Sequence, residues 1–195
     1  MADTLTPQSP LGAFAERFSA LPSSASVVEE PFLAMVDLWV GPSGPGGVAA
    51  SAVLGVDELP RNASTIIAGD DVEVIWLGPD ECLATSRGRA ALTLESQLRQ
   101  AVAEHGGAAV DVSAQRTALR LHGERARDVL AKGCSIDLHP KVFGLGAAVQ
   151  TMLGQAAIVL IPLNDNGTDY RILVRSSFAG YLAEWLVDAA EEFAG

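Results

Sequence analysis

Three residues near the middle of the chain have the types found in hydrolase active sites. Asp111, Ser113 and His122 supply a carboxylate, a hydroxyl and an imidazole, the groups of a serine hydrolase triad. The residues around Ser113 read DVSAQR and lack the G-x-S-x-G turn that presents a nucleophile in α/β-hydrolases. We therefore expect Asp111 and Ser113 to stabilise the following turn or to hold Arg116. A stand-alone hydrolase that uses Ser113 is an alternative.

The histidines and cysteines do not form a metal-binding pattern. His105, His122 and His139 are the only histidines, and none has a second histidine or a cysteine at ligand spacing. Cys82 and Cys134 are the only cysteines. They suit two buried thiols in a reducing cytosol, although the sequence leaves a disulfide between them open. We expect no metal site in this chain.

Glycine-rich and acidic segments offer no complete cofactor site either. Gly144 and Gly146 precede an expected strand, whereas a dinucleotide-binding turn leads from a strand into a helix. Gly41–Gly47 is not followed by Gly-Lys-Ser/Thr, so it is no phosphate loop and reads as an ordinary loop. We interpret Asp80 and Glu81 as solvated acids of a turn.

The three tryptophans are interpreted mainly as core residues. Trp39 and Trp76 fall in expected strands and Trp185 falls in an expected helix, where packing is the usual role of an indole ring. Trp76 lies beside a turn and could line an interface instead. The sequence thus contains no convincing active site.

Hydrophobic periodicity predicts two consecutive halves of strands and helices. In the first half we expect strands over 32–40, 72–78, 81–85 and 108–112 and helices over 48–55 and 93–107. In the second half we expect strands over 117–123, 147–153, 156–161 and 168–175 and helices over 124–133 and from Ser177 onward.

This order predicts an α+β fold made of two fused halves that resemble split βαβ units. Amphipathic helices should pack on mixed or antiparallel sheets. We divide the chain into an N-terminal arm or loosely packed extension over 1–30, a first half over 31–114 and a second half over 115–195. A short helix is conceivable within the arm, at LGAFAERFSAL.

The stretch from Val142 to Asn164 has no charged residue and is long enough to span a membrane. Gln150, Gly154 and Pro162 interrupt it, so we expect two buried strands instead. The N-terminus has neither a basic start nor an apolar core, so we expect no signal peptide and a cytoplasmic location.

Charge is distributed unevenly along the chain. The net charge of −11 argues against non-specific binding to nucleic acid and to anionic membranes. Residues 1–60 carry seven acids and one base, whereas residues 116–141 carry six bases and three acids. Opposed patches suit docking to a partner, although a solvated charged face is the alternative. The candidate contacts are Arg116, Arg120, Arg125 and Arg127.

Four segments together resemble the gamma subunit of heterotetrameric sarcosine oxidase. They are VIWLGPDE, VDVSAQRTALRLHGERARDVLAKGCSIDLHP, QTMLGQAAIVL and YRILVRSSFAGYLAEWLVDA. The resemblance spans about residues 72–190 and includes SPLGAF near the N-terminus, whereas 41–64 contributes little. No single segment is specific, but their order is.

The resemblance implies a function that the spacing of residues does not. In that family the complex demethylates sarcosine to glycine, reduces oxygen to hydrogen peroxide and passes the one-carbon unit to tetrahydrofolate. FAD, FMN, NAD, zinc and tetrahydrofolate are expected on partner subunits, and none on this chain. The gamma subunit resembles part of the aminomethyltransferase of the glycine cleavage system, which is about twice as long.

The resemblance therefore implies a structural and docking subunit without catalytic, cofactor-binding or metal-binding residues of its own. Its partners would be the alpha, beta and delta subunits, with direct contact to the large one. The alternative is a stand-alone folate-dependent one-carbon transferase or folate-binding domain.

Overall fold

The computed structural model describes residues 6–194, which form ten strands and five α-helices. The strands are β1 (Ser26–Glu30), β2 (Ala34–Trp39), β3 (Ile66–Ala68), β4 (Val72–Gly78), β5 (Glu81–Ser86), β6 (Ala108–Asp111), β7 (Arg116–His122), β8 (Val149–Leu153), β9 (Ala156–Pro162) and β10 (Asp169–Arg175). The helices are α1 (Ala15–Ser19), α2 (Pro45–Leu54), α3 (Ala91–Val102), α4 (Ala126–Ala131) and α5 (Ser176–Glu191), with 3₁₀ turns at Gly12–Phe14, Ser23–Ala25 and Ala103–His105.

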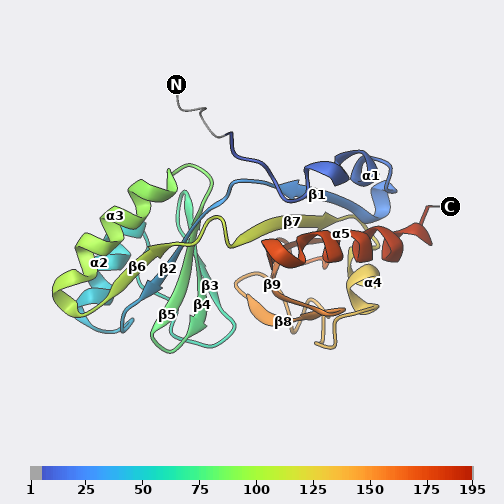
Figure 1. Cartoon of the computed structure of the whole chain (residues 1–195). Helices are drawn as coiled ribbons and strands as arrows, with labels where there is room; N and C mark the ends of the chain where they lie inside the picture. The colour runs from blue at the N-terminus through green and yellow to red at the C-terminus, as the bar shows by residue number, and fades with distance from the viewer. Residues whose placement is uncertain (1–5, 195) are drawn as a thin grey trace, which may run out of the picture.

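The strands form two sheets of five (Figure 1). The N-terminal sheet has the order β3-β4-β5-β2-β6, and the C-terminal sheet has the order β1-β7-β10-β9-β8. Every pairing between these strands is antiparallel. Helices α2 and α3 cover one end of the molecule, while α1, α4 and α5 surround the other (Figure 1). The predicted α+β class with helices on antiparallel sheets is confirmed.

The first thirty residues are not a loosely packed extension, so that expectation is wrong where the structure describes them. β1 pairs with β7 along its whole length, from Ser26 opposite His122 to Glu30 opposite Ala118. Leu11 is fully buried in the core beneath it. The sequence SVVEE of β1 does not alternate between apolar and polar residues, so a five-residue strand beside a Pro- and Ser-rich segment leaves little signal in the sequence. The boundaries at 30/31 and 114/115 themselves remain predictions.

Two smaller differences concern the first half. Helix α2 begins at Pro45, so only the front of the expected loop Gly41–Gly47 lacks helical structure. Proline suits the first helical position because the amide hydrogen it lacks would be unpaired there anyway. Gly55, at φ 70°, ends α2 as expected. The short strand β3 was not predicted, because its three residues follow an irregular segment.

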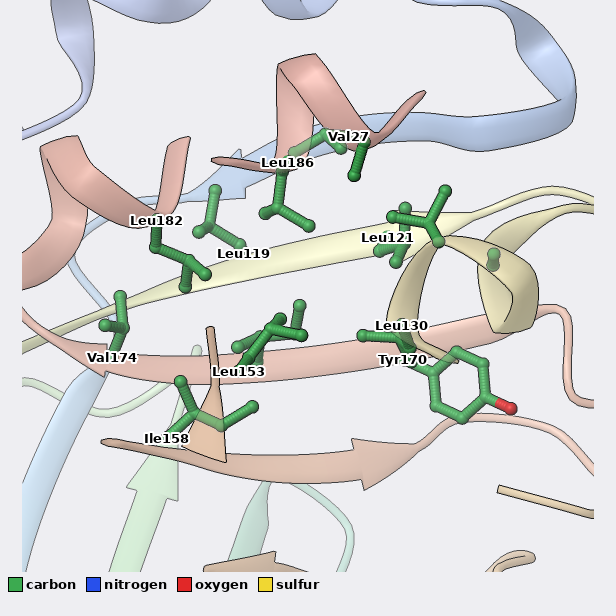
Figure 2. Close-up of a cluster of buried hydrophobic side chains, with 14 of the residues drawn as sticks. Val27, Leu119, Leu121, Leu130, Leu153, Ile158, Tyr170, Val174, Leu182 and Leu186 are labelled. Atoms are coloured by element: carbon green, nitrogen blue, oxygen red, sulfur yellow. The ribbon is translucent and has the colours of Figure 1, made fainter. Parts of the chain in front are cut away.

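The core of the C-terminal half lies between its sheet and α4 and α5. Alternate residues of β7 and β10, such as Leu119, Ile172 and Val174, point to the helices. Leu182 and Leu186 meet them from α5, as Figure 2 shows. The face of α5 that carries Leu182 and Leu186 therefore packs on the sheet, whereas Phe178 and Tyr181 of the same helix are 42% and 40% exposed.

A second apolar layer joins the two sheets. Met35 of β2, Ile75 of β4 and Leu83 of β5 are fully buried against Ala118 of β7 and Leu173 of β10. The backs of the two sheets therefore pack against each other, and their helices lie on the outer sides. A separate cluster that includes Leu38, Leu94 and Leu98 holds α2 and α3 on the N-terminal sheet.

The uncharged stretch from Val142 to Asn164 contains β8 and β9, joined at Gly154 and Gln155. Gly154 has φ 57°, a conformation that glycine adopts without strain. The expectation of two strands is thus confirmed, and β9 is largely buried. The expectation that both are buried is wrong for β8, a partly exposed strand at the edge of its sheet. In the part of the chain that the structure describes, no helix is both long and apolar enough to cross a membrane.

Candidate functional site

The surface between the two sheets carries charged residues at both ends of its apolar centre. Strand β10 shows this most simply, because Arg171, Leu173 and Arg175 alternate on the face that points to the N-terminal sheet. Leu173 lies in the apolar centre. The two arginines, four residues apart, have different environments.

We call the surroundings of Arg171 the closed end of the inter-sheet surface. Its guanidinium donates to Glu30 of β1 through Nε at 2.6 Å, and also to Glu73 of β4. Arg87 donates to the other oxygen of Glu30. Arg171 and Glu30 have side chains only 8% and 9% exposed. Arg171 therefore links the two sheets through a closed ion-pair network.

Burial and neighbouring charges shift the pKa values of the closed end in opposite directions. Burial alone would raise the pKa of Glu30, but hydrogen bonds from Arg171 and Arg87 and their positive charges hold this pKa below its usual value. Burial would lower the pKa of Arg171, yet Glu30 and Glu73 raise it. The partners thus stabilise the ionised forms of both Glu30 and Arg171.

We call the opposite side of the apolar centre the open end. It consists of Asp37 and Trp39 of β2, Glu81 of β5, Val110 of β6, Arg116 of β7 and Arg175 of β10. Arg116 and Arg175 stand directly opposite each other in the β7–β10 ladder. Within residues 6–194, neither arginine forms an ion pair within 4.0 Å. Like charges in this arrangement destabilise a sheet.

The acids of the open end lie near the arginines without pairing with them. Burial and then the charge of Arg175 lower the pKa of Arg116, while Asp37 and Glu81 oppose the shift. Burial and the charge of Asp37 raise the pKa of Glu81, which Arg116 only partly offsets. Asp37 accepts from the indole of Trp39 at 3.1 Å through Oδ2, but its Oδ1 is buried and without a partner.

Large apolar side chains are also exposed at the open end. Trp39 is 50% exposed and Val110 is 53% exposed. Met152, 45% exposed, lies farther across the C-terminal sheet, where it pairs with Ala157. The expectation that Trp39 anchors the core is therefore wrong, because it lies at the end of β2 where the two sheets no longer cover each other. Trp185 does pack against the core of the second half.

A cleft of about 560 Å³ opens beside Arg116. Its wall combines residues from distant parts of the chain, among them Ser9, Phe32, Ala91, Arg116 and Ser176. Phe32 is 65% exposed and has φ 60°, a backbone conformation that is rare for a bulky residue. Solvent therefore reaches Arg116 from this side.

The four arginines proposed as contacts from the sequence fall in two places. Arg116 and Arg120 are on β7, whereas Arg125 and Arg127 belong to the turn and first residues of α4. Arg120 makes a two-pronged ion pair with Asp169, with contacts of 2.8 and 2.5 Å. Arg125 contacts Asp128 and the ring of Phe193. The structure thus does not gather the four into one patch.

The hydrolase arrangement is not assembled. Ser113 donates to Asp111 at 2.6 Å and accepts the amide hydrogen of Met35 at 2.9 Å. His122 ends β7, six residues beyond Arg116, which corresponds to about 20 Å of extended strand. Ser113 and Asp111 therefore stabilise the turn that connects the two sheets, as predicted. No hydrogen bond among the described residues joins either of them to Arg116.

The remaining chemical candidates also have structural surroundings. Cys82 and Cys134 are buried and free, so they do not form the disulfide that the sequence left open. Burial raises the pKa of the Cys82 thiol to about 12, which keeps it protonated and unreactive. Among residues 6–194, no group of three or more His, Cys, Asp or Glu side chains is arranged to hold a metal ion.

The residues of the closed and open ends have little sequence signal. Arg171, Arg175, Glu30 and Glu73 occupy the polar positions of alternating strands, which normally indicate a solvated face. Only the presence of a second sheet against that face makes them partners. Arg116 was the one member of the open end that the basic stretch singled out.

The fold defines the class of protein first. The chain matches the crystal structure of glycine cleavage system aminomethyltransferase T from Bartonella henselae with a TM-score of 0.59 at 15% identity. That match covers 91% of this chain and 49% of the aminomethyltransferase chain, so the two share a fold over half of the larger protein. The two-sheet α+β fold is thus shared with part of the aminomethyltransferase chain.

Sequence comparisons then place the chain in one family. Residues 43–192 match the model of the sarcosine oxidase, gamma subunit family, and the chain belongs to this family. It is 33% identical over 190 residues to sarcosine oxidase subunit gamma of Arthrobacter sp., covering 96% of this chain and 91% of that protein. It is 35% identical over 153 residues to the gamma subunit from Corynebacterium sp. strain P-1, covering 77% and 73% of the two chains.

A solved relative agrees over almost the whole chain. A chain of the heterotetrameric sarcosine oxidase from Corynebacterium sp. U-96, in complex with pyrrole 2-carboxylate, superposes with a TM-score of 0.88 at 33% identity. The match covers 97% of both chains. The resemblance seen in the sequence is confirmed.

Proposed function

We propose that this chain is a non-catalytic docking and stabilising subunit of a heterotetrameric, flavin-dependent sarcosine oxidase. The observation that carries the proposal is the match over 97% of the chain to a chain of the heterotetrameric enzyme. The complex would demethylate sarcosine to glycine, reduce oxygen to hydrogen peroxide and pass the one-carbon unit to tetrahydrofolate.

The structural roles of the candidate catalytic residues support this assignment. Ser113 and Asp111 hydrogen-bond within a connection between sheets, and Cys82 is buried in the core. FAD, FMN, NAD, zinc and tetrahydrofolate would then be held by the alpha, beta and delta subunits. This chain would supply shape and complementary charge, chiefly to the large subunit and in the cytoplasm.

Co-expression of the partner subunits with and without this chain tests the proposal. We expect the complete complex and its sarcosine-dependent peroxide production to depend on the chain, while the isolated chain shows no turnover. Normal assembly and peroxide production without the chain would contradict the docking role. Heat of tetrahydrofolate binding to the isolated chain in calorimetry would favour a folate-dependent transferase instead.

We further propose that Arg116, Arg120, Arg125 and Arg127 include contacts to the large subunit. Arginine suits interfaces because its planar guanidinium can bind a carboxylate through two hydrogen bonds. In a pull-down, Arg116→Ala and Arg125→Glu should each reduce capture of the large subunit. Arg99→Glu, on the exposed face of α3 with a side chain 64% exposed, is the control and should not. Undiminished capture by both folded variants refutes the assignment.

A further inference from the structure

The open end has the side chains of a protein contact but no contact within the chain. Trp39 and Val110 are about half exposed, and Arg116 and Arg175 have no ion pair among the described residues. Tryptophan and arginine are the residues that most often dominate binding energy at protein interfaces. Monomeric surfaces seldom leave such groups together without a use.

The charges of the open end define what would fit. Arg116 and Arg175 face each other across β7 and β10, so a carboxylate between them would relieve their repulsion and could accept from both guanidiniums. An apolar side chain would cover the exposed face of Trp39.

We propose that the open end is the contact surface for a polypeptide segment of the large subunit. The segment would place an Asp or Glu carboxylate between Arg116 and Arg175 and an apolar side chain against Trp39. This inference rests on the docking role proposed above and names the surface that performs it.

The net charge favours a different chain over a second copy as the occupant. Each copy carries −11, and two such chains repel each other at moderate ionic strength. A partner that is less acidic overall can still present one carboxylate to the two arginines. The closed end is a poorer candidate, because Arg171 and Glu30 are already paired and buried.

Binding of the chain to the purified remaining subunits tests this surface. Trp39→Ala and Arg175→Glu should each raise the dissociation constant by at least about tenfold, as truncation or charge reversal of an interface anchor does. The matched controls are Leu92→Ala and Arg61→Glu, which alter an exposed apolar and an exposed basic residue elsewhere. Both controls should bind within about twofold of the unmodified chain.

The outcomes separate this inference from the docking role itself. Unmodified binding by folded Trp39→Ala and Arg175→Glu overturns the surface but leaves the docking role intact. Absence of binding by the unmodified chain contradicts both the proposed surface and the docking role. A chain that sediments as a dimer, and becomes monomeric on Trp39→Ala, shows that a second copy occupies the surface. Circular dichroism establishes folding, and Arg175→Glu keeps the test decisive if Trp39→Ala unfolds.

Discussion

The two ends of the inter-sheet surface contain similar groups in opposite states. At the closed end Arg171 links Glu30 and Glu73 across the sheets and is almost fully buried. At the open end Arg116 and Arg175 lie near acids but pair with none of the described residues. A charged group near a sheet contact therefore serves stability at one end and, in our proposal, recognition at the other.

The largest expected difference between the ends is in stability. Arg171→Met should lower the free energy of unfolding by about 3–5 kcal/mol, because it removes the buried partner of Glu30 and leaves that buried carboxylate only the exposed Arg87. Arg175→Met, on the same strand and face, should change it by no more than about 0.5 kcal/mol. Urea denaturation of the isolated chain measures both. Equal losses would show that the two ends do not differ.

Double-mutant cycles should give a smaller but more direct contrast. Combining Arg171→Met with Glu73→Gln should reveal a coupling energy of about 0.5–3 kcal/mol, as for residues in one ion-pair network. The corresponding cycle of Arg116→Met and Glu81→Gln should give a smaller coupling energy, because these charges interact without forming an ion pair. A coupling at the open end as large as that at the closed end contradicts the unpaired geometry.

Acidification should reduce the contribution of Glu30 to the free energy of unfolding. Because its folded pKa lies below the unfolded value of 4.5, its contribution is present above pH 4.5 and is lost as pH falls through the folded pKa. The unfolding free energy should therefore drop on acidification, and Glu30→Gln should make this dependence shallower. Chemical denaturation between pH 3 and pH 7 tests it. An unchanged slope in Glu30→Gln would assign the acid sensitivity to other carboxylates.

The smallest expected effect has the opposite sign. The folded pKa of Glu81 is raised, so its ionised form opposes folding at neutral pH and its stability contribution improves as pH falls. Glu81→Gln should thus raise the unfolding free energy at pH 7 by up to about 0.5 kcal/mol, the usual range for a surface substitution. A clear loss of stability in the denaturation curve would mean that Glu81 makes a favourable contact in the fold.

The periodic elements were predictable because burial on one face leaves a local pattern. The alternation in β7 and β10 identified the residues that face the helices correctly. β1 could not be placed, since its partner β7 is distant in sequence. The difference between the closed and open ends could not be predicted from the sequence either. Arg171 and Arg175 have the same spacing to Leu173 and differ only in the residues that the other sheet places beside them.

The pairing of β1 with β7 also determines how the chain can be divided. A fragment that starts at residue 31 would lack β1, leaving the backbone amides and carbonyls of β7 exposed along one border. Such an unprotected strand recruits other chains and promotes aggregation. During synthesis β1 must likewise wait for almost the entire first half to emerge before β7 reaches it. The N-terminal segment thus makes the two halves a single folding unit.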